Sequence, residues 1–291
     1  MYARVVAAFA AALLGATALL LPTSDARAGG AGEPPSVVAH RGASALAPEN
    51  TLAAVDAAAG LGVDWVENDV QRTADGTLVV IHDDNLRRTT DVEEIFPGRA
   101  PWKVKDFTAA EIARLDAGSW FAPRFAGVRL PTLKEYMRRV EDNGQNLLLE
   151  IKNPELYPGI EQQTLKLLGN EGWLDQPHQA GRLIVQSFSA DSIRTVHDLA
   201  PGVSTAFLGT PPVADLAGYA AFTDGINPSY ASISTGYVSA AHAFTGPHGR
   251  PLAVLAWTVD DAATALRVTG YGVDGVISNK PDVVREALRD R

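Results

Sequence analysis

The sequence contains no cysteine in its 291 residues. This absence excludes disulfide bonds, catalytic thiolates, and zinc or iron–sulfur sites that need cysteine ligands. A fold built from this chain must rely on its hydrophobic core, and a chain of this length is long enough to form one.

Positive charge is scarce, because 25 Lys and Arg stand against 34 Asp and Glu, for a net charge of −9 at pH 7. A chain this acidic is repelled by nucleic acid and by anionic membranes. We therefore expect no nucleic-acid partner, and nothing in the composition implies an obligate protein partner. A small soluble molecule, or the neutral headgroup of a lipid, fits better.

Only one long apolar run exists, from Val5 to Leu21, and it follows a short positive start. Pro22 ends the run, and Ala26-Arg27-Ala28 then forms an A-x-A cleavage pattern. This order predicts a secretory signal peptide, residues 1–28, cut after Ala28, and hence a secreted protein. A membrane anchor is the alternative, but the run is slightly shorter than the ~20 residues that span a bilayer. We expect no stable membrane insertion.

Removal of residues 1–28 leaves 263 residues, with 23 Lys and Arg against 33 Asp and Glu. That length is close to the ~250 residues of a single (β/α)8 barrel. Residues 29–35 are rich in Gly and Pro and form a predicted flexible lead-in. Residues 36–291 are expected to form one domain.

Eight short apolar runs alternate with amphipathic segments along this domain. Most are β-branched or leucine-rich with little polar alternation, as is typical of parallel strands buried on both faces. Strand–helix alternation repeated eight times predicts a (β/α)8 TIM barrel, with a doubly wound open sheet as the alternative. The runs are Val37–His40, Trp65–Val70, Leu147–Lys152, Leu183–Phe188, Ser204–Leu208, Gly225–Pro228, Ala253–Val259 and Asp274–Ser278.

Several amphipathic segments begin with residues that commonly start helices. Asn50 is expected to cap a helix over residues 51–61, and Asp260 or Asp261 to open the helix that ends at Thr269. Further predicted starts are Thr132, Ser189 and, at an N1-like position, Pro281.

Two features interrupt the alternation. Asp75-Gly76 is a tight-turn dipeptide, so the second strand is expected to return as a hairpin arm over Leu78–His82. Residues 84–130 then show no barrel unit and contain several Pro and Gly. We interpret them as a small inserted subdomain after the hairpin, over the face of the barrel where catalytic loops gather.

Polar side chains stand at the predicted strand ends. The carboxyl ends of barrel strands surround a single mouth, so these side chains are expected to meet there. They are His40 and Arg41 after strand one, Glu67 and Asp69 two apart on strand two, His82 on the hairpin arm, and Glu150 and Lys152 on strand three.

Each residue type in this set has a chemical use. Three carboxylates without cysteine favour a hard divalent cation such as Ca²⁺ or Mg²⁺. The arginine and the lysine suit phosphate oxygens. Two histidines supply a proton acceptor and a proton donor near neutral pH. The combination predicts phosphoryl transfer on an anionic ester.

Taken singly, these motifs have structural interpretations. A Glu-x-Asp pair is usually solvated or capping, a strand-end histidine is often only a satisfied polar residue, and Glu150 with Lys152 could be an internal ion pair. Their joint occurrence at strand ends is what favours a functional site. Four other histidines fall in expected loops or helices and are interpreted as surface residues, namely His178, His197, His242 and His248.

At these same residues the sequence resembles the glycerophosphodiester phosphodiesterases, over nearly all of residues 36–291. The shared motifs follow the family's order, and together they are highly specific. They are Val38–Gly42, Pro48–Thr51, Glu67–Val70, Asp75-Gly76, His82-Asp83, Asp91, Leu130–Leu133, Glu150–Lys152, Gln186–Phe188 and Gly272–Gly275.

The resemblance implies a role for each matching residue. His40 and His82 match the catalytic pair, Glu67, Asp69 and Glu150 the metal ligands, Arg41 and Lys152 the phosphate contacts, and Glu49 a supporting position. Trp257 resembles an aromatic that packs on glycerol, although a core tryptophan at a strand end fits as well. The insertion resembles the small subdomain over the substrate's glycerol end.

The family's chemistry implies hydrolysis of glycerophosphodiesters, for example glycerophosphocholine and glycerophosphoethanolamine, to glycerol 3-phosphate and an alcohol. One divalent cation is expected, with Ca²⁺ slightly favoured over Mg²⁺ because it is available outside cells. We assign His40 as the first base and His82 as the first acid. The alternatives are a lysophospholipase D-like or other phospholipid phosphodiesterase, and a non-catalytic phosphodiester-binding barrel.

Overall fold

The computed structural model describes residues 35–289. The predicted signal peptide, and all but the last residue of the predicted lead-in, lie outside that range. Within it, every helix is too short or too polar to cross a membrane.

Eight parallel strands close into a barrel. Each pairs with the next along the chain, and β1 pairs with β9 on one side and with β2 on the other. This closure confirms the (β/α)8 fold and excludes an open, doubly wound sheet. The strands are β1 Ser36–Ala39, β2 Trp65–Arg72, β4 Asn146–Ile151, β5 Leu183–Ser187, β6 Ser204–Leu208, β7 Gly225–Asn227, β8 Ala253–Ala256 and β9 Gly275–Ser278.

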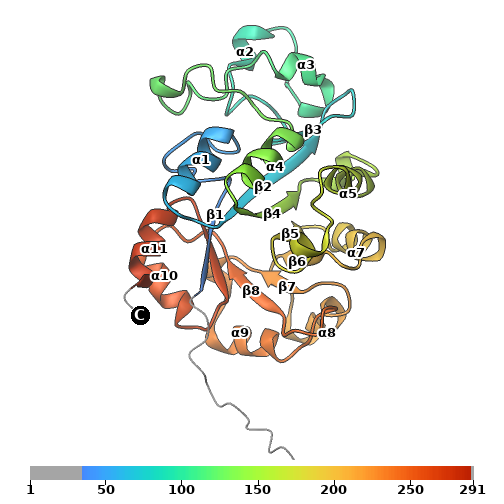
Figure 1. The fold of residues 1–291 in the computed structure, drawn as a ribbon, viewed down its shortest axis with the longest axis vertical. Coiled ribbons are helices and arrows are strands. Elements are labelled where there is room, and N and C mark those ends of the chain that lie inside the picture. The colour runs from blue at the N-terminus through green and yellow to red at the C-terminus, as the bar shows by residue number, and fades with distance from the viewer. Residues whose placement is uncertain (1–34, 290–291) are drawn as a thin grey trace, which may run out of the picture. The chain divides into compact units, whose positions relative to one another are not determined.

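Helices connect the strands and surround the barrel (Figure 1). Apolar side chains of the strands that point outward pack against these helices, whereas a smaller cluster around Leu148 and Leu255 fills the barrel itself. The helices of the barrel units are α1 Leu52–Gly60, α4 Leu133–Asp142, α5 Ile160–Asn170, α6 Gln176–Gln179, α7 Ala190–Leu199, α8 Leu216–Tyr219, α9 Thr235–His242, α10 Ala262–Thr269 and α11 Pro281–Arg289.

Most predicted helix starts are confirmed, with one correction. Thr132 caps α4 through a reciprocal capping box with Glu135, and Asp261 caps α10. The prediction for α1 was wrong, because Thr51, and not Asn50, accepts the hydrogen bond from a first-turn N–H. The Asn50 side chain is buried and points instead to the barrel mouth.

The second strand returns as an antiparallel hairpin. β3 Leu78–Val80 pairs with the end of β2, and the turn between them places Gly76 at φ 82°, where glycine is favoured. Residues 84–130 follow, with the short helices α2 Val92–Ile95 and α3 Ala109–Ile112 beside β3 (Figure 1). Their apolar side chains, among them Leu86, Phe107 and Leu115, form a separate cluster together with Val79 and Ile81 of the hairpin arm.

Candidate active site

The fold brings the predicted polar residues to one mouth of the barrel. His40 and Arg41 directly follow β1, and the parallel register sets Asp69 of β2 beside Glu150 of β4. A cavity of about 120 Å³ opens here. Its lining includes both predicted catalytic histidines, the predicted phosphate-contacting cations, and two of the three carboxylates, Glu67 and Glu150.

The three carboxylates form a compact, buried group. One oxygen from each of Glu67, Asp69 and Glu150 lies within 4.8 Å of the others. Glu67 Oε1 and Asp69 Oδ1 are buried and have no hydrogen-bond partner within residues 35–289. Buried acceptors in that state are costly unless a cation satisfies them. The donor set therefore fits a hard divalent cation.

The pKa shifts of the three carboxylates also favour a bound divalent cation. Burial, and then the charges of Asp69 and Glu150, raise the pKa of Glu67 well above its usual range. Burial and the Asp69 charge raise the pKa of Glu150 to about 8. Burial also opposes the charge on Asp69, but Arg41, His82 and Lys152 outweigh it and lower the pKa of that carboxyl. Carboxyls with raised pKa values, here Glu67 and Glu150, release protons when a dication binds.

Two cations flank the carboxylates. The Arg41 guanidinium lies 2.9 Å from Glu49 Oε1 and 3.4 Å from Asp69 Oδ2. Its backbone N–H donates to Glu67 Oε2 at 2.8 Å. Lys152 Nζ donates to Glu150 Oε1 at 2.8 Å, so this pair is an internal ion pair whose two members also line the cavity. Both cations can face phosphate oxygens there.

The two histidines are held by different partners. His40 Nδ1 lies 2.7 Å from Asn279 Oδ1, and Asn279 Nδ2 donates to Asp260 Oδ2 at 2.7 Å. That second bond fixes the amide, so His40 carries its proton on Nδ1 and offers Nε2 to the site. His82 Nδ1 lies 2.7 Å from the Asp83 carboxylate. Burial, and then the Arg41 charge, lower the pKa of His40 to about 4.

Trp257 fits both of its interpretations. It lines the cavity and also packs against the apolar cluster inside the barrel. Its indole N–H donates to Asn227 O at 2.8 Å, and its ring meets Phe188 edge-on at 5.6 Å. Phe188 is half exposed at the end of β5 and adds an aromatic face to the mouth.

Sequence reasoning missed several supporting residues. Asn50 donates to Asp69 Oδ2 at 2.8 Å, Asn279 holds His40, and Arg88 bridges Glu49 and Asp83. Asn279 directly follows the last barrel strand, so the rule that strand ends carry the site could have found it. Arg88 carries no such positional signal.

One prediction about the other histidines was wrong. His178 is buried, and its ring packs at a tilt against Trp173, with ring centroids 4.6 Å apart. It also contacts the carboxylates of Asp175 and Glu141. A histidine that packs on an aromatic ring between two carboxylates is a structural element of α6, which precedes the amino end of β5. A pattern of isolated histidines does not show which ones are covered by a neighbouring helix.

Comparison with known proteins decides the family. The model of the glycerophosphoryl diester phosphodiesterase family matches residues 40–283. This chain belongs to that family. A glycerophosphodiester phosphodiesterase of Bacillus subtilis (strain 168) is 33% identical over 302 residues, which cover 98% of each chain. Another, from Caldanaerobacter subterraneus subsp. tengcongensis, is 36% identical over 87% of this chain and 97% of its own.

A solved structure of the family agrees. The phosphodiesterase of Oleispira antarctica, in complex with the product sn-glycerol 3-phosphate, matches with a TM-score of 0.75 and 30% identity. The match covers 87% of this chain and 96% of that one. The present chain is thus a phosphoric diester hydrolase, a glycerophosphodiester phosphodiesterase built on a TIM barrel, and not a binding barrel without activity.

Proposed function

We propose that this glycerophosphodiester phosphodiesterase uses His40 and His82 as its acid–base pair. It converts substrates such as glycerophosphocholine and glycerophosphoethanolamine to glycerol 3-phosphate and the free alcohol. The observation that carries the proposal is that both imidazoles line one cavity with Arg41 and Lys152, each with its Nδ1 already engaged. The product bound in the relative from Oleispira antarctica supports the substrate class.

Substrate binding follows from the charges and rings at the mouth. Arg41 and Lys152 contact the non-bridging phosphate oxygens, because a guanidinium fork and an ammonium group both suit such oxygens. Trp257 and Phe188 offer aromatic faces to the carbons of glycerol. These contacts place phosphorus between the two histidines.

The partners of the two histidines assign their roles. Burial, and then the Arg41 charge, lower the pKa of His40, which leaves its ring neutral. Because the Asn279 amide holds Nδ1, Nε2 is free to accept a proton. The Asp83 carboxylate holds His82 through Nδ1, so its Nε2 remains for the departing alcohol. His40 is therefore the first base, and His82 is the first acid.

The reaction has two steps. His40 takes the proton of the glycerol 2-hydroxyl, whose oxygen attacks phosphorus within the same molecule, and His82 protonates the departing alcohol. Water then opens the resulting cyclic phosphate, with the two histidines in reversed roles. Tethering favours the first step because the nucleophile is already next to phosphorus.

Glu67, Asp69 and Glu150 would hold one divalent cation, Ca²⁺ or Mg²⁺, with Ca²⁺ favoured for a secreted enzyme. Bound there, the cation would offset negative charge on the phosphate oxygens. Secretion itself is proposed from the first 28 residues alone. The mass of protein recovered from the culture medium tests it, since cleavage after Ala28 leaves a chain that begins at Gly29.

An analogue without the 2-hydroxyl, propane-1,3-diol phosphocholine, tests the mechanism. We expect it to bind and inhibit competitively while ³¹P NMR shows no cleavage. Glycerophosphocholine serves as the positive control under the same conditions. Cleavage of the analogue at a comparable rate would show that water attacks phosphorus directly.

A further inference from the structure

Arg88 lies outside the cavity, yet it is joined to the residues around it. Its guanidinium makes four hydrogen bonds to two carboxylates. Nη1 and Nη2 each donate to Glu49 at 2.8 Å. Nε and Nη2 donate to Asp83 at 2.7 and 3.0 Å. A guanidinium has five N–H groups, so this side chain has little left with which to bind substrate.

Each of these carboxylates holds a residue of the active site. Asp83 Oδ1 accepts from Arg88 Nη2 and also lies 2.7 Å from His82 Nδ1. Glu49 Oε1 accepts from the same Nη2 and, at 2.9 Å, from Arg41 Nη1. A single guanidinium nitrogen therefore contacts both the oxygen that orients His82 and the oxygen that orients Arg41.

We propose that Arg88 is a positioning residue that fixes His82 and Arg41 relative to each other. The inference rests on the proposed role of His82 in proton transfer. Arg88 belongs to the insertion, Asp83 to the end of the hairpin arm, and Glu49 to the loop between β1 and α1. The Arg88 side chain thus connects the insertion, the hairpin arm and the β1–α1 loop. Through the two carboxylates it orients His82, the proposed acid, and Arg41, the proposed phosphate contact.

The burial of the acceptors supports this role. The Glu49 side chain is only 12% exposed. Without Arg88, this largely covered carboxylate would pair with Arg41 alone. At Asp83, burial opposes ionisation, but the hydrogen bonds from Arg88 and then His82 outweigh it and lower the pKa to about 2. Asp83 thus stays charged beside His82, and its orientation is set from both sides.

Lysine cannot replace Arg88 in this geometry. A planar fork reaches two oxygens of each of two carboxylates, whereas an ammonium group is a single point of charge. Arg88→Lys conserves the charge and loses the fork. It therefore separates an electrostatic role from a positioning role.

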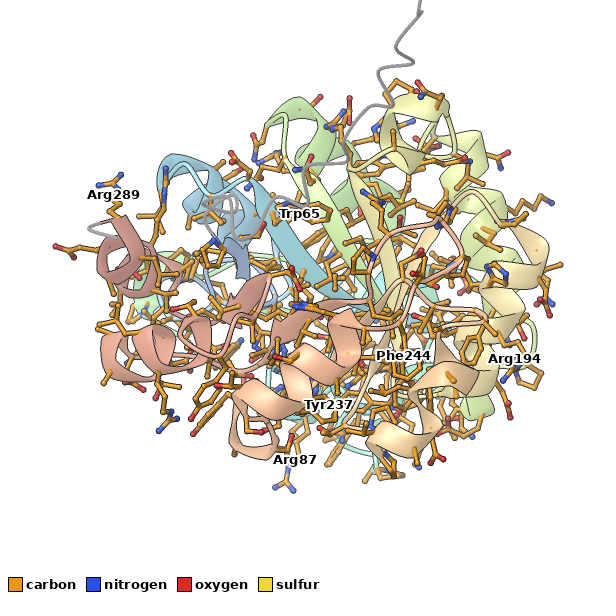
Figure 2. All side chains as sticks on the ribbon, turned by 90° about the horizontal axis from the view of Figure 1, so that it is seen from below. Trp65, Arg87, Arg194, Tyr237, Phe244 and Arg289 are labelled. Carbon is orange, nitrogen blue, oxygen red and sulfur yellow. The ribbon has the colours of Figure 1, made fainter. Side chains whose placement is uncertain are left out.

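The adjacent Arg87 supplies a matched control. Its side chain is 65% exposed, pairs with Glu93 at 2.9 Å, and extends outward from the body of the protein (Figure 2). Arg87→Gln removes the same charge one residue away without touching either carboxylate. An effect of net charge alone should appear equally in Arg87→Gln and in Arg88→Gln.

The first measurement is steady-state hydrolysis of glycerophosphocholine by the full chain. We expect Arg88→Gln to lower kcat and raise KM, with kcat/KM down about 10- to 100-fold, since small misplacements of catalytic groups cost that much. Asp83→Asn should act mainly on kcat, and Glu49→Gln mainly on KM. Arg88→Lys should recover only part of the loss, and Arg87→Gln should stay within about twofold of the parent, as expected for an exposed pair.

The second measurement is a mutant cycle. In the Asp83→Asn, Glu49→Gln background, Arg88→Gln should change kcat/KM by no more than about twofold, because no carboxylate remains to orient. If Arg88→Gln lowered kcat/KM as much in this background as in the parent enzyme, the proposal would be overturned. Full activity of Arg88→Lys or Arg88→Gln in the parent background would also overturn it. Unchanged melting temperatures of the variants exclude misfolding as the cause. Near-normal activity of His82→Ala would instead sink the proposed mechanism, whatever Arg88 does.

Discussion

At the scale of single residues, the three buried carboxylates make the first prediction. Glu67→Gln removes a charged oxygen donor from the proposed cation site. We expect titration calorimetry with Ca²⁺ to show affinity lowered by at least about tenfold, and a chelator to abolish activity of the parent enzyme. Glu155→Gln, at an exposed position just beyond β4, is the control and should bind as the parent does. Full activity after chelation would remove the cation from the mechanism.

Asn68 makes a second prediction at this scale. It lies between two of the proposed ligands but points to the other side of β2. Both of its amide atoms are buried and unpartnered within the described part of the chain. Such groups cost ~1–3 kcal/mol, so Asn68→Leu should raise the free energy of unfolding by an amount of that order in urea denaturation.

Asn68→Asp is the contrast, because it buries a charge where the amide already lacks partners. It should destabilise the protein strongly. If Asn68→Leu also destabilised it, the amide would have a stabilising contact that the described residues do not supply.

The proposed ligands and acid–base residues could be located from sequence because two simple rules place them. Residues two apart on a strand share a face, which sets Glu67 beside Asp69, and strand ends share a mouth. The partners that orient them could not be found in this way. Asn279 is 239 positions from His40, and no local pattern connects the two.

At the scale of elements, the insertion depends on one carboxylate. Asp116 accepts hydrogen bonds from the backbone N–H groups of Gly118, Ser119 and Gly127, and from the Ser119 hydroxyl. Burial opposes its charge, but these donors together outweigh that effect and hold the pKa well below its ordinary value of 3.8. The charged form therefore organises the loop that runs back toward the barrel.

Because the folded pKa is below the unfolded one, the charge stabilises the fold above about pH 4 and this stability is lost as the pH falls further. We expect Asp116→Asn to lower the unfolding free energy by about 1–3 kcal/mol at pH 7. The difference in unfolding free energy between Asp116→Asn and the parent should stay constant down to about pH 5 and become smaller below pH 4. Asp142→Asn, at the exposed end of α4, should show no such gap. A gap that widened on acidification would contradict this account.

The barrel strands and most helix starts were predictable, because apolar runs and capping residues are local signals. Thr132 and Ser189 cap their helices as predicted. The insertion was visible only as a break in the pattern, since α2 and α3 have four residues each and show no helical period. Asn50 was misassigned because a capping residue type also suits a buried carboxylate, here Asp69.

At the scale of the whole molecule, closure of the barrel creates the site. β1 pairs with both β2 and β9, so residues near position 40 meet residues near position 279. The length and the eightfold alternation predict such a barrel. They do not show how the mouth is completed, because that depends on loops from both halves of the chain.

The most direct test of the account is glycerol 3-phosphate release from glycerophosphocholine by the parent enzyme and by His40→Gln, His82→Gln and His242→Gln. Acid–base catalysis typically supplies ~10²–10⁴ in rate, so each of the first two variants should lose about that factor in kcat. His242 is paired with Asp274, which precedes β9 at the opposite end of the barrel, and its variant should match the parent. Near-normal release by the His40 or His82 variant, with the fold intact, would contradict the assignment of this mouth as the active site.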